Sequence, residues 1–375
     1  MPETTSALPF VDLEAQRRRL GNGLIDAIAA VIEHGQFIMG PDVFELERQL
    51  VDFSGAAEVV TCASGTDALL LALLAQEIGP GDAVYVPSFT FAATAEMIPL
   101  VGATPVFVDV LPDTFNLDPA SLKEALGASA GLRPRAVIPV DLFGLPADYA
   151  EIVEIATAHD LVVIADAAQS FGATLGERAV GTLAPVSTTS FFPAKPLGCY
   201  GDGGAIFTND PDIAARLRSL RVHGQGSHKY ENVLLGINGR LDTIQAAVLL
   251  EKLRIFPDEL LARAKVAERY TRVLSQRIQT PTVPEGVTSA WAQYTVRVPR
   301  RDHVAVALRE AGVPTAVYYP VPLHRQPAYR SFPTAPGELA VSERLATEVL
   351  SLPMHPYLDE PTHERICNAV LGAAT

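Results

Sequence analysis

The sequence is poor in cysteine and contains no long hydrophobic run. Its three cysteines, Cys62, Cys199 and Cys367, lie far apart, with no CxxC pair and no metal-type spacing. We therefore expect free thiols, no bound metal and a reducing, cytoplasmic environment. No apolar run approaches the ~18 residues of a membrane span, and residues 1–20 lack the basic-then-apolar order of a signal peptide. These absences predict a protein that does not associate with membranes.

Positive charge is scarce as well. The 375 residues include 29 lysines and arginines against 43 aspartates and glutamates, a formal net charge of −14 at pH 7. Sequence-independent binding to nucleic acid or to anionic lipid requires a broad cationic face. The charge balance therefore argues against both kinds of partner and leaves small anionic molecules, bound through local basic residues.

Short apolar runs alternate with helical stretches between residues 55 and 210. Hydrophobicity is continuous rather than alternating within these runs, at 58–64, 82–88, 104–110, 135–141, 161–168 and 187–193. A sheet that helices cover on both faces requires this pattern. The sequence therefore predicts an α/β fold built on a large, mostly parallel sheet.

A smaller α+β domain is predicted to follow. Residues 240–256 show helical spacing without glycine or proline, and proline and glycine cluster at 280–286. Beyond that cluster we expect, in order, a strand at 291–299, a helix at 303–312, a strand at 314–320 and helices near 338–350 and 361–372. The chain is long enough for two domains, which we place at residues 1–256 and 257–375.

Lys195 is isolated among uncharged residues. It is one of only five lysines, and it is the only charged side chain between Arg178 and Asp202, within SFFPAKPLGCYGDGG. Desolvation lowers the pKa of an amine and makes it a nucleophile toward carbonyl carbon, as in a Schiff-base lysine. The alternative is a structural lysine whose charged end reaches water. The isolation of Lys195 favours a catalytic role for its amine over a structural one.

Asp166 ends a predicted strand within LVVIADAAQSFGA. It is the only charge between Asp160 and Glu177, and no lysine or arginine lies within ten residues on either side. Ligands bind at the carboxyl ends of strands in doubly wound sheets, and a buried carboxylate needs a cationic partner. A protonated pyridine nitrogen would supply that cation. A distant arginine, or a helix-capping role for Asp166, is the alternative.

Two further runs contribute weaker signals. CASGTDAL, residues 62–69, places small residues and Thr66 where a strand meets a helix, an arrangement that binds phosphate; capping of the helix by Ser64 or Thr66 is the alternative. Phe89 and Phe91 follow another strand and offer a platform for a flat ring, although a buried phenylalanine is more often core. Together with Asp166 and Lys195, these features describe a site for pyridoxal phosphate.

The chain resembles the DegT/StrS family of nucleotide-sugar aminotransferases, which have the aspartate-aminotransferase-like (type I) fold. The resemblance covers nearly the whole chain through SGTDAL, DAAQSFGA, SFFPAKPLGCYGDGG, INGRLDTIQAAVLLEKL and SLPMHPYL, in this order. It implies that Lys195 forms the Schiff base with pyridoxal phosphate, that Asp166 pairs with the pyridine nitrogen, and that Gln169 lies near the phenolic oxygen. It also implies a homodimer with shared active sites. The residues implied at the phosphate and the ring face are Gly65, Thr66, Ser190, Phe91 and, from the neighbouring subunit, Asn238.

The family uses L-glutamate, which leaves as 2-oxoglutarate, to aminate keto groups on nucleotide-linked sugars. FFPAKPLGCYGDGG and SLPMHPYL most resemble the branch that acts on UDP-2-acetamido-2-deoxy-3-oxo-glucuronate and supplies diamino uronic acids to surface polysaccharide such as the lipopolysaccharide O-antigen. That branch commonly has histidine then tyrosine where this chain has Tyr318 and Tyr319. A uronate carboxylate needs a cation, for which the candidates are Arg240, His228, Lys229, His324 and Arg325.

Four other functions are weighed against this one. A sugar dehydratase of the same fold has histidine in place of the lysine, and Lys195 is present. A non-catalytic regulator would normally carry a DNA-binding module, for which the chain has no spare segment. A dinucleotide-binding protein would need GxGxxG early after a strand, which CASGTDAL lacks. An aminotransferase for a dTDP-linked 3-keto-6-deoxy sugar is the nearest competitor.

Overall fold

The computed structural model describes residues 8–128 and 131–374, and within them seven strands form one large sheet, in the order β1-β9-β8-β5-β4-β2-β3. β9 is antiparallel to both of its neighbours, and the other neighbouring pairs are parallel. This arrangement confirms the predicted α/β fold. The strands are β1 Glu58–Cys62, β2 Asp82–Pro87, β3 Thr104–Val108, β4 Arg133–Val137, β5 Val162–Asp166, β8 Val186–Ser190 and β9 Gly204–Thr208.

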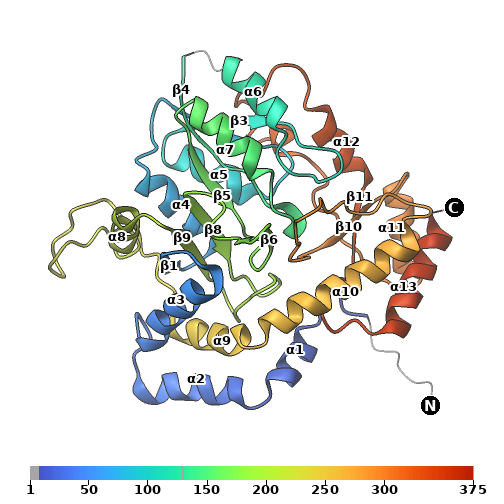
Figure 1. Ribbon diagram of the computed structural model, residues 1–375, viewed down its shortest axis with the longest axis horizontal. Coiled ribbons are helices and arrows are strands. Elements are labelled where there is room, and N and C mark those ends of the chain that lie inside the picture. The colour runs from blue at the N-terminus through green and yellow to red at the C-terminus, as the bar shows by residue number, and fades with distance from the viewer. Residues whose placement is uncertain (1–7, 129–130, 375) are drawn as a thin grey trace.

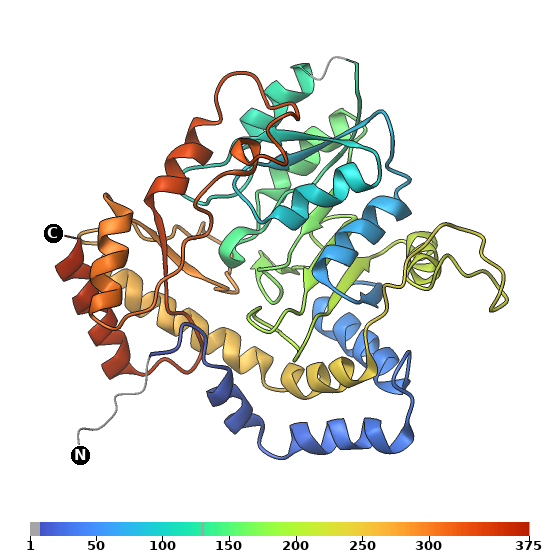
Figure 2. The same cartoon turned by 180° about the vertical axis from the view of Figure 1, so that it is seen from behind.

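Helices cover both faces of this sheet (Figures 1 and 2). Successive residues of a strand point to opposite faces, and in β1 Val60 packs in one buried cluster with α4 (Gly65–Ala75), whereas Val59 packs in another with α3 (Pro41–Ser54) and α9 (Thr243–Leu253). Burial on both faces explains the continuous hydrophobicity of the strands. The other helices of this part are α1 Leu13–Leu20, α2 Gly23–His34, α5 Ala92–Leu100, α6 Pro119–Ala128, α7 Tyr149–Ala158 and α8 Pro211–Leu220, beside the short strands β6 Thr174–Leu175 and β7 Arg178–Ala179.

A second, smaller sheet has a core of its own. Strand β10 (Tyr294–Arg297) pairs antiparallel with β11 (Val349–Leu352). Their inward residues pack against α10 (Phe256–Leu274), α11 (Arg301–Glu310) and α13 (Glu360–Ala373). In Figure 1 the long helix α10 runs from the helices under the large sheet to this second core.

The connection between α11 and β11 does not stay with the smaller sheet. Leu323, Tyr329 and Leu339 pack in the core of the large sheet, and Thr334 forms a bridge with Phe107 of β3. The chain then returns through α12 (Ala340–Glu348) to β11. The division that we place after residue 256 stays a prediction.

One secondary-structure prediction in this region is wrong, and another is confirmed. The strand expected at 314–320 is reduced to a single bridge between Ala316 and Ser351, because the chain then leaves the small sheet and Tyr318 and Tyr319 turn toward a cavity beside the large one. The helix expected near 338–350 is confirmed as α12, which ends at Glu348, where β11 begins and pairs with β10.

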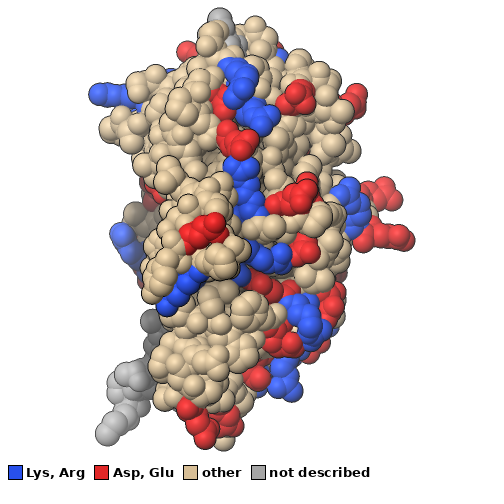
Figure 3. All heavy atoms as spheres, turned by 90° about the vertical axis from the view of Figure 1, so that its left-hand side faces the viewer, with Lys and Arg blue, Asp and Glu red and all other residues tan. Residues whose placement is uncertain are grey.

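The surface agrees with the charge balance of the sequence. On the face shown in Figure 3, basic side chains stand among acidic ones rather than in a patch of their own. No helix within residues 8–128 and 131–374 is both long and apolar enough to cross a membrane. All three cysteines are buried and free.

A buried ion pair links two helices that pack on the large sheet and also contacts strand β1. Arg221, which follows α8 and is 2% exposed, donates to Glu47 of α3 at 2.5 Å and to the Thr61 carbonyl of β1 at 2.7 Å. Removing one partner of such a pair leaves an uncompensated buried charge.

We therefore predict that Arg221→Met lowers the free energy of unfolding by about 3–5 kcal/mol, measured by urea denaturation at pH 7. Arg48→Met, on the exposed face of α3, is the control and should change stability by less than about 0.5 kcal/mol. Adding Glu47→Gln to Arg221→Met should restore part of the loss. If Arg221→Met were as stable as Arg48→Met, the prediction would be wrong.

Candidate active site

A cavity of about 490 Å³ lies at the carboxyl ends of the parallel strands. Its walls come from segments that follow β1, β2, β4, β5 and β8, the position at which sheets of this kind bind ligands. The predicted residues that line it are Gly65, Thr66, Phe91, Asp166, Gln169, Ser190, Lys195, Tyr318 and Tyr319. Segments far apart in the sequence therefore meet at one place.

Asp166 is the last residue of β5 and is 6% exposed. Its Oδ2 accepts a hydrogen bond from the Thr94 hydroxyl at 2.7 Å, and its Oδ1 accepts one from the Ala168 N–H at 3.2 Å. Burial raises the pKa of this carboxyl, while the two hydrogen bonds and the charge of Lys195 oppose the rise. Among the described residues Asp166 forms no ion pair. A cation in the cavity would favour its ionised form.

Lys195 lies in the loop between β8 and β9. Its backbone N–H donates to the Phe192 carbonyl at 2.8 Å. The side chain is only partly buried, because it lines the cavity. Desolvation nevertheless lowers the pKa of the amine, and the charge of Asp166 opposes the shift. The shift increases the fraction of neutral, nucleophilic amine at neutral pH, as the sequence predicts.

The start of α4 forms a small polar cradle. Ser64 is the helix cap, since its hydroxyl accepts from the Asp67 N–H at 3.0 Å, and this leaves the Thr66 hydroxyl toward the cavity without a partner among the described side chains. A Cβ on Gly65 would lie 2.6 Å from the Ser190 Cβ. Only glycine therefore permits this approach of α4 to the end of β8.

The two phenylalanines have different environments. Phe91 is 56% exposed and lines the cavity, 6.3 Å from Tyr319 between ring centroids. Phe89 is 1% exposed and belongs to a buried cluster. Phe91 is thus the one of the pair that is available to a ligand.

Gln169 is held from two sides. Its side-chain oxygen accepts a hydrogen bond from the N–H of Phe143, which lies in the short helix η1 (Leu142–Gly144), at 2.7 Å. Its side-chain amide donates to the Tyr319 hydroxyl at 3.4 Å.

Three residues that sequence reasoning missed lie at or beside the cavity. Thr94 holds Asp166, and Gln293 lines the wall with an Oε1 that has no hydrogen-bond partner among the described residues. Asp141 is fully buried behind Asp166, donates its N–H to the Asp166 carbonyl at 3.0 Å, and accepts from Ser170 at 2.6 Å. Burial raises the pKa of Asp141 to about 7. Its place just after β4 is a signal of the same kind that pointed to Asp166.

Other predicted residues lie outside this cavity. Asn238 and Arg240 line a neighbouring hollow, which shares Ser64 and Asp202 with the cavity. His228 and Lys229 are exposed on the segment between α8 and α9, which extends outward from the body of the chain in Figures 1 and 2. Within one chain these four side chains are not brought to Lys195.

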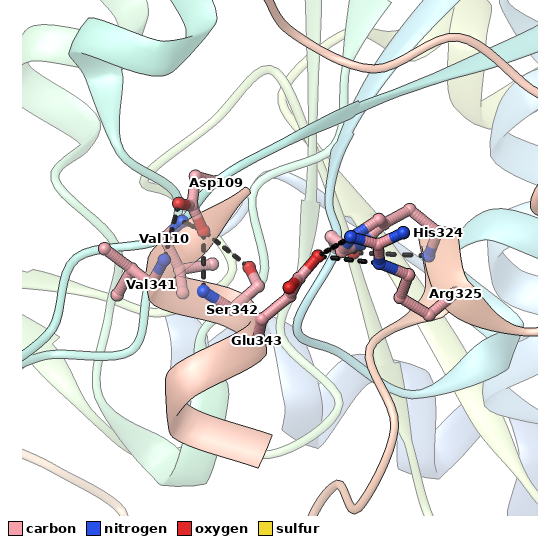
Figure 4. A network of polar contacts seen from close by, with 8 residues as sticks. Asp109, Val110, His324, Arg325, Val341, Ser342 and Glu343 are labelled. Carbon is pink, nitrogen blue, oxygen red and sulfur yellow. Dashed lines mark hydrogen bonds and ion pairs between the residues drawn. The ribbon is translucent and has the colours of Figure 1, made fainter. Parts of the chain in front are cut away.

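His324 and Arg325 belong to a separate network, shown in Figure 4. In the short helix η2 (Leu323–Arg325), His324 contacts the Ser88 hydroxyl at 2.5 Å and Glu343 at 3.1 Å, and Arg325 pairs with Glu343 at 2.5 Å. Glu343 belongs to α12, and Asp109 caps the start of this helix by accepting from the Ser342 N–H at 2.8 Å. This network fastens α12 to the end of the large sheet, and neither basic residue lines the cavity.

The cavity fits pyridoxal phosphate. Asp166 is a buried carboxylate that forms no ion pair among the described residues, the start of α4 offers free donors beside Gly65, and Lys195 offers an amine with a lowered pKa. A ring with a protonated nitrogen, a phosphate and an aldehyde would meet all three requirements. Gln169 and Phe91 are the residues that would contact the ring.

The chain matches the DegT/DnrJ/EryC1/StrS aminotransferase family over residues 19–371. A Pseudomonas aeruginosa relative, UDP-2-acetamido-2-deoxy-3-oxo-D-glucuronate aminotransferase, is 48% identical over 97% of this chain and 99% of its own. A Streptomyces venezuelae relative, dTDP-3-amino-3,4,6-trideoxy-alpha-D-glucose transaminase, is 39% identical over 98% of this chain and 96% of its own.

Solved structures show the same relationship. A DegT DnrJ EryC1 StrS aminotransferase from Brucella abortus is 50% identical and has a TM-score of 0.97, covering 98% of this chain and 99% of its own. NtdA from Bacillus subtilis, solved with bound cofactor PMP, is 29% identical with a TM-score of 0.90, over 98% of this chain and 85% of its own. By family match, fold and fit of the cavity, the chain belongs to the DegT/DnrJ/EryC1/StrS family and is a pyridoxal phosphate-dependent aminotransferase of the type I fold.

Proposed function

We propose that this aminotransferase transfers the amino group of L-glutamate to UDP-2-acetamido-2-deoxy-3-oxo-D-glucuronate, in the cytoplasm, and so supplies a 3-amino uronic acid for surface polysaccharide. The observation that carries the proposal is the meeting of Lys195, Asp166 and the start of α4 in one cavity. The choice of sugar is supported by the P. aeruginosa relative, which at 48% is more similar than the dTDP-sugar relative at 39%.

The roles that we propose for the side chains are supported by their contacts. When bound, pyridoxal phosphate supplies an aldehyde that takes up the amino group and a ring that accepts electrons from the substrate carbon. Asp166, held by Thr94 and by the Ala168 N–H, would keep its charge directed at the protonated ring nitrogen. The lowered pKa of Lys195 lets Nζ accept and return a proton at the substrate carbon near neutral pH.

The charge of the proposed substrate supports a second subunit at the site. The substrate carries a diphosphate and a carboxylate, yet Lys195 is the only lysine, arginine or histidine among the described residues that line the cavity. Buried anions need cationic or hydrogen-bonding partners. We infer that Arg240, His228 and Lys229 of one subunit approach the cavity of the other, and that Asn238 contacts the phosphate of its cofactor. Because His324 and Arg325 are already paired with Glu343, Arg240 is our candidate for the uronate carboxylate.

Lys195→Ala tests the site itself. Borohydride reduction after incubation with pyridoxal phosphate should fix a pyridoxyl group on Lys195 in the native protein, because an amine of lowered pKa forms an imine readily. The variant should lose this label, the visible absorbance band and all turnover. Lys265→Ala, at an exposed position, is the matched control and should keep all three. A labelled and active Lys195→Ala protein would refute the assignment.

A panel of keto sugars tests the substrate. The purified protein is mixed with L-glutamate and with UDP- or dTDP-linked keto sugars generated in situ, and 2-oxoglutarate is measured. We expect release with the UDP-linked 3-oxo uronate at a kcat/KM at least about tenfold above any 6-deoxy sugar, since an unpaired buried cation penalises a sugar without the carboxylate. Activity with the dTDP-linked 6-deoxy sugars alone would show that the proposed uronate substrate is wrong, although the protein would still be an aminotransferase.

Mixed dimers test the shared site. Lys195→Ala and Asn238→Asp chains should each be inactive alone, the second because a carboxylate would repel the cofactor phosphate. After dissociation and reassociation at equal amounts, half of the dimers are mixed and each has one intact site, so about a quarter of native activity should return. A mixture that stays inactive would place the whole site within one chain.

A further inference from the structure

Helix α9, formed by TIQAAVLLEKL within the long helical run of the sequence, has two polar residues that its core packing does not explain. Ala246, Val248 and Leu249 pack in the buried cluster under the large sheet. Gln245 and Lys252 lie two turns apart and therefore share a face of the helix. That face contacts the loop between β8 and β9, which contains Lys195.

Both contacts are made to the backbone of this loop. The Lys252 ammonium donates to the Gly198 carbonyl, with 2.6 Å between Nζ and O, and lies 4.2 Å from the centre of the Tyr200 ring. The Gln245 Oε1 accepts from the Tyr200 N–H at 2.8 Å. Helix α9 thus holds the loop at two points within five residues of Lys195.

The loop is tight enough to transmit a displacement. The Lys195 N–H donates to the Phe192 carbonyl at 2.8 Å, and the Cys199 N–H donates to the Phe191 carbonyl at 2.7 Å. A Cβ at Gly198 would lie 2.6 Å from the Phe192 carbonyl oxygen, so Gly198 is packed directly against the turn that begins the loop. Movement of Gly198 therefore shifts the backbone from which Lys195 extends.

Lys252 is kept in this place at a cost in stability. It is 1% exposed and forms no ion pair within 4 Å among the described residues. Burial lowers its pKa to about 8, although the charges of Glu259 and Cys199 oppose the shift. A lysine whose pKa is lower in the folded than in the unfolded chain destabilises the fold below about pH 8, and the penalty disappears as the pH rises toward 10.5. Stability alone does not account for such a residue, whereas functional sites often retain one.

We propose that Lys252, together with Gln245, is a positioning residue that fixes the loop of Lys195, so that Nζ of Lys195 stays at the reacting atoms. The proposal rests on the proposed role of Lys195. It assigns no contact with the substrate to Lys252, which acts only through the backbone of residues 198–200.

Lys252→Met is the test, because methionine keeps the apolar stem and removes the donor. In the cofactor-free protein, amide hydrogen exchange in residues 191–201 should become about tenfold faster, while β3 stays as protected as in the native protein. In the loaded protein, the apparent pKa of the visible band should shift, and kcat should fall about 10- to 100-fold with little change in the KM for glutamate. Lys265→Met, exposed on α10, is the matched control and should match the native protein in every measurement.

A folded Lys252→Met protein with native exchange in residues 191–201 and a native band pKa would overturn the proposal. Should this variant fail to fold, Gln245→Ala decides by the same measurements, since it removes the other contact without touching a buried charge. If Gln245→Ala then has the amide exchange and the band pKa of the native protein, the proposal is overturned. Faster amide exchange at Tyr200 would support it. Absence of a visible band in the native protein would instead count against the proposed function, while the exchange result still reports on the loop.

Discussion

The charge of Asp166 constrains the rest of the site. β5 ends in the interior, so its terminal carboxylate loses water, and the two hydrogen bonds from Thr94 and Ala168 do not neutralise it. Lys195 supplies the nearest positive charge along the cavity wall, but the same burial disfavours its protonated form. Desolvation therefore disfavours the charged form of both Asp166 and Lys195, while each of the two charges favours the other. A flat cation between them would favour the ionised carboxylate and the neutral amine together, which is the pair of states that transamination requires.

The antiparallel strand β9 is what brings Lys195 to this place. A purely parallel sheet would need a crossover helix after β8, and the chain would leave the carboxyl edge. Instead the loop 191–203 turns back at that edge and pairs β9 with β8 and β1. Lys195 thus stays at the same end of the sheet as Asp166 and the start of α4. The tightness of the loop and its contacts with α9 restrict where the amine can lie.

The strands and the two isolated charged residues of the site can be predicted from the sequence. The residues that contact or position them cannot. The continuous apolar runs predict β1 to β5 and β8, because burial on both faces leaves a local signal. Asp166 and Lys195 are recognisable by their isolation. Thr94 and Lys252 act through partners that are 72 and 54 residues away in the chain, and Gln293 lines the cavity from a distant segment, so no local pattern shows them. The segment 314–320 reads as a strand from its composition, yet tertiary contacts with the cavity prevail over that propensity.

The distribution of the remaining charges bears on how an acidic chain would bind the anionic substrate that we propose. Its net charge of −14 forbids a general attraction for anions, so each negative group of the substrate needs a cation placed for it. Arg221 and Arg325 are already paired, with Glu47 and Glu343 respectively. Arg240 is different, because its hollow holds Asp67 and Asp202 but no ion pair forms with either among the described residues. These two carboxylates repel one another, and burial together with this repulsion raises the pKa of Asp67. A guanidinium left unpaired beside the cavity is available to whichever subunit's substrate lies within its reach.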